Sequence, residues 1–352
     1  MKKYLSLLLL PLALFGCNES STKQVALDAN VLDKASSLKA DSVDISGIDV
    51  TQAKKIYVYS DSILIVKNNE RDGNWLVDIY NINTKKRLNH FFKIGRGHGE
   101  VLLSEIRITG NHMNVQDFQQ SKSSIVNIDS AILNTGYAPK LTKEKNVSIS
   151  STAYLNGKRI IENGYAFEDD NADIHQPGKR LLSEEEYAKE ANKTHEYDVF
   201  NVTCSGRIIV SPDHDRIIYA SNSQSFIEIF NKNLDKLKTI TGPNDLKTEY
   251  HISSKTGEVV YKKYIPFTYL GYYCSKEDFG LIYYGVSIDA DNYDFEQKNS
   301  YLFIFDWDGN LKKSINLKCH AEAIAKSKLY PNCYYVSTRD RKGDFKILKL
   351  HE

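Results

Sequence analysis

The segment whose side chains could most readily bind a ligand or take part in a reaction is GRGHGE, at residues 95–100. It brings an arginine, a histidine and a glutamate together directly behind an apolar run, so Arg96, His98 and Glu100 could form a polar ligand-binding cluster. A phosphate-binding glycine loop would have to join a strand to a helix, so that amide groups and the helix dipole face the anion. Residues 101–110, VLLSEIRITG, return to a strand pattern instead, which argues against a phosphate site.

The same hexapeptide also fits a purely structural role. Glycines at positions 95, 97 and 99 permit positive φ angles or a close approach of the backbone, as a tight connection between two sheets requires. We favour this interpretation, a tight corner, over the ligand-binding one.

Other candidate sites are weaker. The acidic segments EDDNAD (168–173) and DADNYDFE (289–296) could bind calcium, but the second lacks the glycine and the terminal glutamate spacing of an EF-hand, so solvated loops are favoured. The chain contains no GxSxG or HExxH motif, and its nine histidines have no short ligand spacing. We therefore expect no metal or cofactor and an enzyme only as the less favoured alternative.

The composition favours strands and excludes one class of partner. Its 23 Tyr and 14 Phe suit pleated, half-buried surfaces. With 46 basic and 45 acidic side chains the formal charge is +1, so the basic surplus of a nucleic-acid binder is missing.

A recurring strand–turn–strand unit organises the chain. Three copies align at 75–95, 226–243 and 301–317, each with apolar alternation, an Asn or Asp, a short turn and a second strand. Each follows another strand pair, at 55–68, 207–221 and 267–286. Less regular copies lie at 106–129, 147–169 and 333–350.

Six units of this size predict an all-β, six-bladed β-propeller of four-stranded antiparallel blades over residues 43–352. We expect residues 43–48 to complete the blade that ends at Leu350, which closes the ring. In the functional interpretation, Arg96, His98 and Glu100 would project into its central funnel. One short helical insertion is predicted at 181–198, where Ser183 and Glu186 have capping-box spacing, as a spacer or a lid.

The N-terminus has the residue pattern of an export signal. Residues 1–16 have two lysines and an apolar run too short to span a bilayer, followed by Cys17, and this resembles a bacterial lipoprotein signal with its lipobox. The resemblance implies cleavage before Cys17, its acylation, and a membrane anchor. Residues 17–42 are polar and predict a flexible tether. Residue 18 is Asn18 and not the aspartate that typically retains such lipoproteins at the inner membrane, so the outer membrane is favoured.

Four cysteines remain: Cys204, Cys274, Cys319 and Cys333. The sequence does not choose among their three possible pairings. Free thiols are the default expectation, and Cys319 with Cys333 is the favoured pair if a disulfide forms.

Two motifs point to a known family. GRGHGE resembles the GRGPGE signature of six-bladed TolB-like propeller lipoproteins, with His98 where that family usually has proline. SPDHDRIIYAS (211–221) is similar to the repeat of TolB propellers. The resemblance covers roughly 43–350 and implies the propeller fold and export rather than an activity.

These observations predict a lipid-anchored binding or scaffolding module for a protein, peptide or glycan at the cell envelope. The alternative is a hydrolase or lyase acting on carbohydrate or peptide in the central channel. Tyr272, Tyr273, Tyr283 and Tyr284 form an aromatic run, but they lie in alternating strands, so half of them must face the core.

Overall fold

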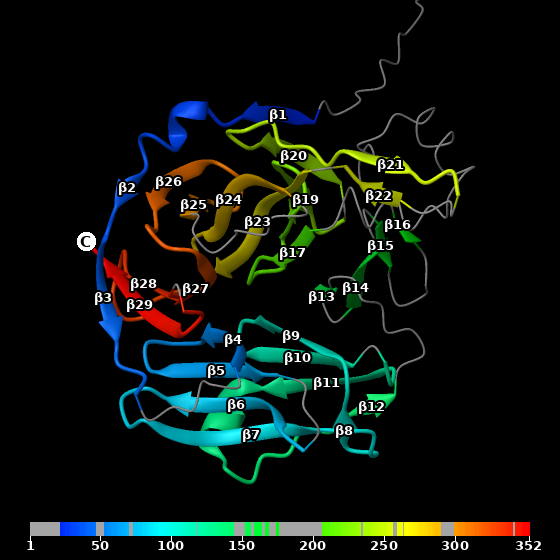
Figure 1. Cartoon of the computed structure of the whole chain (residues 1–352), viewed down its shortest axis with the longest axis vertical. Helices are drawn as coiled ribbons and strands as arrows, with labels where there is room; N and C mark the ends of the chain where they lie inside the picture. The colour runs from blue at the N-terminus through cyan, green and yellow to red at the C-terminus, as the bar shows by residue number, and fades with distance from the viewer. Residues whose placement is uncertain are drawn as a thin grey trace, which may run out of the picture.

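Six small sheets form a ring in the computed structural model (Figure 1). The structure describes residues 22–46, 53–69, 73–117, 119–143, 206–233, 235–255, 259–262, 264–289, 299–340 and 342–352, together with the backbone of four strands between 152 and 175. Each sheet is one blade with four or five strands. The prediction of an all-β, six-bladed propeller is confirmed.

The first half of the ring contains blades 1 to 3. Blade 1 has β4 (Ala53–Val58), β5 (Ile63–Asn68), β6 (Trp75–Asn81), β7 (Lys86–Ile94) and β8 (Glu100–Val101). Blade 2 has β9 (Ser104–Thr109), β10 (His112–Asp117), β11 (Lys122–Asn127) and β12 (Thr142–Lys143), with the short helix α1 (Ile128–Leu133). Blade 3 has β13 (Thr152–Leu155), β14 (Lys158–Asn163), β15 (Ala166–Glu168) and β16 (Ile174–His175).

The second half contains blades 4 to 6. Blade 4 has β17 (Gly206–Val210), β18 (Arg216–Ser221), β19 (Phe226–Asn231) and β20 (Lys236–Thr241), joined by β1 (Lys23–Ala26). Blade 5 has β23 (Tyr264–Cys274), β24 (Phe279–Asp289), β25 (Tyr301–Phe305) and β26 (Leu311–Asn316), joined by β2 (Ser36–Ser37). Blade 6 has β27 (Ala321–Lys326), β28 (Tyr334–Arg339), β29 (Phe345–His351) and β3 (Lys39–Val43). A side hairpin, β21 (Tyr250–Ile252) with β22 (Val259–Tyr261), and the 3-10 turn η1 (Ala29–Val31) complete the described elements.

The three hairpins predicted from the repeat are present as β6–β7, β19–β20 and β25–β26. In each turn the side chain of the Asn or Asp accepts a hydrogen bond from a backbone N–H two residues later. These side chains are Asn81, Asn231 and Asp306. The sequence repeat therefore reflects a repeated turn, because a short polar side chain closes the same bend in three blades.

The core lies between neighbouring blades. Leu76 and Ile79 of blade 1 pack in one cluster with Met113 and Val115 of blade 2. Likewise, aromatic residues of blade 5, such as Phe303, pack against isoleucines of blade 4. A single blade could not shield both of its apolar faces, so the stability of each blade depends on its neighbours.

The ring closes where the two ends of the chain meet. β3 pairs antiparallel with β29, with Ala40 opposite Leu350. The predicted closure by an N-terminal strand is correct, but the strand begins and ends earlier than the expected residues 43–48.

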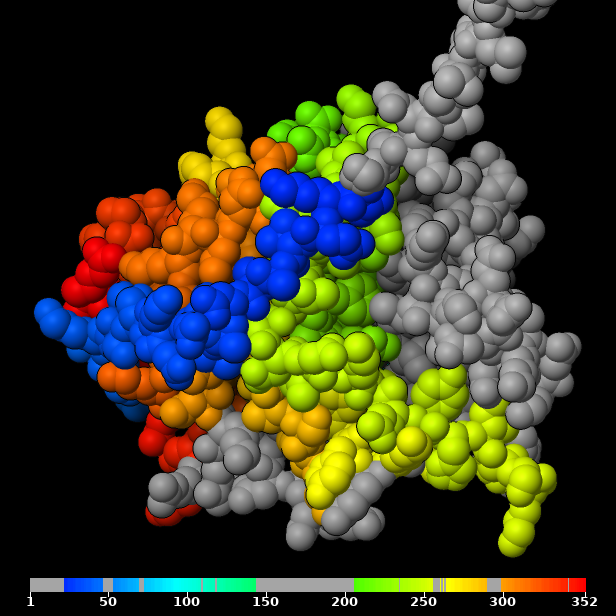
Figure 2. All heavy atoms as spheres, turned by 90° about the horizontal axis from the view of Figure 1, so that it is seen from above, coloured from blue at the N-terminus to red at the C-terminus, as the bar shows by residue number. Residues whose placement is uncertain are grey.

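The prediction of a flexible tether over 17–42 is wrong for its described part. β1 and β2 pair in parallel with β20 and β26, and β3 belongs to blade 6. The outer strands of blades 4 and 5 offer unpaired backbone groups, and a polar segment can pair with them through its backbone alone. Figure 2 shows this N-terminal segment, in blue, lying across the surface of these blades.

Several predicted features lie outside the described residues. These are the signal segment with Cys17, the helical insertion at 181–198, Cys204 and most of the two acidic segments. Among the residues that the structure describes, no three or more possible metal ligands come together. Within the same residues, none of the helices has the length and apolar character needed to cross a membrane.

The three described cysteines are free thiols. Cys319 precedes β27 and Cys333 precedes β28, so the antiparallel pairing of these strands places the two residues at opposite ends of one hairpin. Six residues of strand span about 20 Å, whereas a disulfide needs Cα atoms within about 7 Å. The favoured Cys319–Cys333 pair is therefore wrong.

Candidate functional site

The GRGHGE segment forms a tight corner between β7 and β8. The chain doubles back so that β8 pairs in parallel with β7, with Val101 opposite Ile94. Gly95 N donates to Val101 O at 2.9 Å, and Gly97 N donates to Glu100 Oε2 at 2.7 Å. The carboxylate of Glu100 is thus turned inward and closes its own loop.

The glycines at 95 and 97 leave space for the folded-back side chain of Glu100. A Cβ atom at Gly97 would lie 2.9 Å from Glu100 Cδ, and one at Gly95 would overlap the same carboxylate. Gly99 has nothing within 4 Å, and none of the three glycines has a positive φ. The predicted close approach therefore holds at positions 95 and 97, while the predicted positive φ does not occur.

Side chains of blade 2 hold this corner through hydrogen bonds to its backbone. The buried Lys122 donates from Nζ to Gly97 O and to Glu100 O, both at 2.9 Å, and Gln120 Nε2 donates to Gly95 O at 3.1 Å. Arg96 and His98 are exposed. None of Arg96, His98 and Glu100 is among the described residues that line the central cavity, so their expected projection into the funnel is wrong. Ligand binding by these residues at another surface stays a prediction.

A cavity of about 490 Å³ lies at the centre of the ring. It is lined by the first strands of five blades, β4, β9, β17, β23 and β27. β27 lies between β4 and β23, and β23 also contacts β17. The charged and tyrosine side chains on these strands include Lys55, Tyr57, Glu105, Arg107, Arg207, Tyr272 and Glu322.

Strand periodicity explains why these side chains face the cavity. Lys55 and Tyr57 of β4 alternate with Ile56, which is fully buried between blades. Glu105 and Arg107 of β9 flank the buried Ile106 in the same way. Apolar residues therefore hold each inner strand in place while polar ones point to the centre.

Both carboxylates on the inner strands of the cavity wall, Glu322 and Glu105, have cationic partners. Arg339 Nε donates to Glu322 Oε1 at 2.7 Å, and the same guanidinium donates to Lys54 O at 3.0 Å. Lys67 Nζ lies 3.7 Å from Glu105 Oε1. These cations belong to β28 and β5, outside the inner ring, so the wall carboxylates are neutralised from behind.

Lys55 has an unusual environment for a lysine. Burial, together with the positive charge of Arg207, lowers its pKa to about 8, although Glu105 and Glu322 oppose the shift. Its Nζ lies 5.1 Å from the centre of the Tyr57 ring. Burial also raises the pKa of Tyr57, whose hydroxyl donates to Ile106 O at 3.3 Å. At neutral pH both cavity side chains are protonated, and Lys55 is close to losing its charge.

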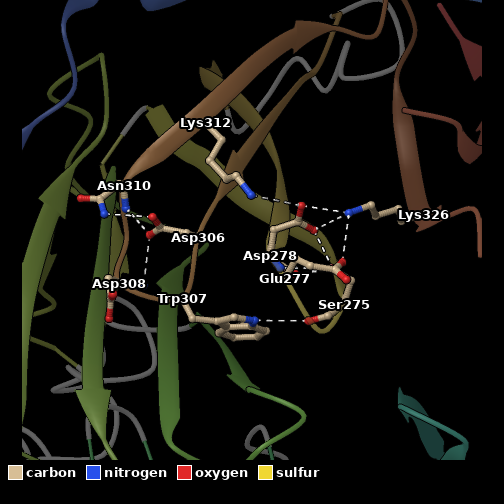
Figure 3. Close-up of polar contacts among 9 residues, drawn as sticks. All are labelled: Ser275, Glu277, Asp278, Asp306, Trp307, Asp308, Asn310, Lys312 and Lys326. Atoms are coloured by element: carbon tan, nitrogen blue, oxygen red, sulfur yellow. Dashed lines mark hydrogen bonds and ion pairs between the residues drawn. The ribbon is translucent and has the colours of Figure 1, made fainter. Parts of the chain in front are cut away.

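One rim of the cavity is formed by the β23–β24 turn and is firmly held (Figure 3). Lys326 of β27 donates to both carboxylate oxygens of Asp278 at 2.9 Å, and Ser275 Oγ donates to Asp278 Oδ1 at 2.7 Å. Trp307 Nε1 donates to Ser275 O at 3.2 Å. The nearby thiol of Cys274 has a pKa raised by burial, which disfavours a reactive thiolate. Lys326 therefore braces the rim.

Sequence reasoning did not select the charged residues of this cavity. The available signal was a charged or tyrosine side chain alternating with isoleucine in the first strand of a unit, as in KIY (55–57) and EIRI (105–108). In the aromatic run, Tyr283 and Tyr284 are buried outside the cavity wall, whereas Tyr272 and the buried Tyr273 line the cavity.

Comparisons with known proteins agree with this architecture. A family model described as TolB-like 6-blade propeller-like matches residues 45–327. A Bacteroides fragilis protein described as exported aligns with a TM-score of 0.51 at 12% identity, over 94% of this chain and 98% of its own. A DUF4221-family member from Bacteroides vulgatus aligns with a TM-score of 0.52 at 8% identity, over 90% and 96%.

One further solved structure is much longer than this chain. Raptor from Chaetomium thermophilum aligns with a TM-score of 0.45 at 12% identity over 90% of this chain, which spans 29% of that protein. No curated protein matches the sequence.

Proposed function

Because the chain belongs to the TolB-like six-bladed propeller family, we propose that it is a lipid-anchored binding module whose ligand site is the central cavity. Its ligand is a segment of a protein, a peptide or a glycan at the cell envelope. The observation that carries this proposal is the cavity itself, into which five inner strands direct charged and aromatic side chains. Side chains on strands are held more rigidly than side chains on loops, so little entropy is lost when they contact a ligand.

The anchor is the acylated Cys17, and the outer membrane is the favoured site. The lipoprotein-like N-terminus supports this location, as does the fold shared with a protein described as exported. Only residues 18–22 separate Cys17 from β1, and the six steps from Cys17 to Lys23 span at most about 22 Å when extended. The edge of blade 4 that carries β1 therefore faces the membrane.

Binding is tested with the mature chain on arrays of envelope glycans and peptides. Wild type should retain a ligand that Tyr272→Ala loses, because Tyr272 lines the cavity. Tyr264→Ala is the matched control, since Tyr264 lies in the same strand but is 52% exposed and lies outside the cavity wall. Equal retention by all three proteins would place the binding surface elsewhere.

Anchoring is tested separately with Cys17→Ser. Metabolic labelling with palmitate should mark the wild-type protein and leave this variant unlabelled and released from the membrane fraction. Labelling of the variant, or its unchanged membrane association, would overturn the lipid anchor without affecting the cavity proposal.

A second function is favoured by one specific observation, the lowered pKa of Lys55 beside Tyr57. A lysine that is partly neutral near pH 8 can act as a general base, so the cavity could house a hydrolase or lyase acting on carbohydrate or peptide. Turnover of a bound ligand that rises with pH near 8 and disappears in Lys55→Met would support the enzyme. Binding without turnover would support the module.

A further inference from the structure

The cavity wall carries positive charge without a bonded partner. Glu105 and Glu322 are paired with Lys67 and Arg339, as described above. Neither the Lys55 ammonium nor the Arg207 guanidinium has a hydrogen bond or an ion pair with any residue that the structure describes. Both side chains line the cavity, on β4 and β17.

Buried lysines elsewhere in the described chain are bonded. Lys122 donates three hydrogen bonds at the corner of blade 1, to Gly97 O, Glu100 O and Gln120 Oε1. Lys238 similarly donates to Asp308 O, Gly309 O and Asn310 Oδ1. The fold can thus satisfy a buried cation with oxygen atoms, whereas the partly exposed Lys55 and Arg207 keep their donor groups available to the cavity.

Lys55 and Arg207 also repel each other, since the charge of Arg207 contributes to the lowered pKa of Lys55. Two like charges facing one cavity destabilise the empty site. An anion between them would remove this repulsion and would gain charge-assisted hydrogen bonds.

We propose that the central cavity binds the carboxylate group of a small ligand, with Arg207 and Lys55 holding the carboxylate and Tyr57 and Tyr272 contacting the rest of the molecule. This inference rests on the proposed binding function and specifies its ligand class. The planar guanidinium of Arg207 matches a carboxylate in bidentate geometry, and Lys55 adds a point charge. Tyrosine rings offer apolar faces to a sugar ring or a peptide side chain.

Charge and size both restrict the ligand. Arg207 carries a full positive charge and Lys55 is close to losing its own, so a single negative charge is balanced more readily than the double charge of a phosphate group. A volume of about 490 Å³ falls within the range of small-molecule sites, roughly 300–1,000 Å³. An acidic sugar or the C-terminal residues of a peptide fits these limits.

The experiment measures affinity by calorimetry at pH 7 for matched pairs of acid and amide. The pairs are galacturonic acid with galacturonamide, and an N-acetylated dipeptide with its C-terminal amide. Inorganic phosphate is a third probe. One acid should bind at least about tenfold more tightly than its amide, because charge-assisted hydrogen bonds are lost in the amide. A preference for galacturonic acid over its amide would identify the carboxylate of a sugar, and a preference for the dipeptide acid over its amide would identify that of a peptide.

Site variants connect this preference to the two cations. Arg207→Gln and Lys55→Gln should each weaken binding of the acid at least about tenfold and leave the weak amide binding unchanged. Arg207→Lys keeps the charge and should give an intermediate affinity, since the bidentate geometry is lost. Lys140→Gln, which removes an exposed charge outside the cavity wall, is the control. Melting temperatures show that each variant is folded.

The outcomes separate this inference from the binding function. Equal affinity for acid and amide, or tighter binding of phosphate than of either acid, overturns the carboxylate assignment and leaves a binding cavity. Failure of every probe also overturns it, and the array result with Tyr272→Ala then decides whether the binding function survives.

Discussion

The corner of blade 1 and the centre of the ring both gather charged side chains, but they use them in opposite ways. At the corner, Glu100 accepts from the Gly97 amide and Lys122 donates to two carbonyl groups. At the centre, Lys55 and Arg207 face the cavity with no hydrogen bond to a described residue. The charged groups at the corner stabilise the fold through hydrogen bonds, whereas the two cations at the centre remain available to a ligand.

In this chain the motif richest in polar residues is therefore a poor guide to the binding site. GRGHGE is conspicuous because two of its glycines leave space where Glu100 folds back onto the loop. The cavity residues are inconspicuous because each stands alone in an ordinary strand. If the comparison is sound, changes at the corner should lower stability and changes at the centre should leave it nearly unchanged.

The largest effect is expected for Lys122→Met. This substitution removes the buried donor to Gly97 O, Glu100 O and Gln120 Oε1, so several acceptors lose their partner. The free energy of unfolding should fall by about 3 kcal/mol or more, measured by urea denaturation.

Lys143→Met is the matched control for that change. Lys143 lies opposite Lys122 in the β11–β12 ladder but is exposed, so its loss should change stability by less than about 0.5 kcal/mol. Equal losses in the two variants would mean that the corner does not depend on the bonded charge.

A smaller effect is expected for Gly95→Ala. The added Cβ overlaps the Glu100 carboxylate, which must move and give up its hydrogen bond to Gly97 N. We expect a loss of about 1–2 kcal/mol in unfolding free energy. Gly99→Ala should be nearly neutral, because nothing lies within 4 Å of its Cβ position, and a comparable loss there would contradict the steric argument.

The pH dependence of stability reports on the centre. The pKa of Lys55 is about 8 in the folded protein and about 10.4 in an unfolded chain, so the unfolded state binds more protons between these values. Stability should therefore rise with pH from about 8 to 10 in wild type relative to Lys55→Met. Solvent screening at this partly buried group limits the gain to less than about 1 kcal/mol.

Denaturation of both proteins at pH 7.5 and pH 10 measures this difference. The charged groups that affect Lys55 are Arg207, Glu105, Glu322 and Lys67, and they are the same in both proteins. A difference that stays constant with pH, or that falls, would show that Lys55 keeps its usual pKa.

The smallest effect on stability is expected for Arg207→Gln. Its guanidinium makes no hydrogen bond to a described residue, and its charge repels Lys55, so unfolding free energy should stay within about 0.5 kcal/mol of wild type or rise slightly. A melting temperature lowered as much as that of Lys122→Met would make Arg207 structural and remove the contrast between the two regions.

Three features could be predicted from the order of the amino acids: the fold class, the turn chemistry of three hairpins and the closure of the ring by an N-terminal strand. These features are local, since alternation places apolar residues between blades and Asn81, Asn231 or Asp306 closes each bend. The backbone pairing of β1 and β2 escaped prediction, because it depends on free edges of distant strands rather than on side chains.

Which charged residues share a site depends on the packing of the blades. Strand periodicity predicts that Lys55 points to one side of β4 and Arg207 to one side of β17. It does not predict that both side chains line the same cavity. That arrangement depends on the stacking of six blades around one centre, a property of the whole ring. The same packing neutralises Glu105 and Glu322 from behind and leaves two cations facing the cavity.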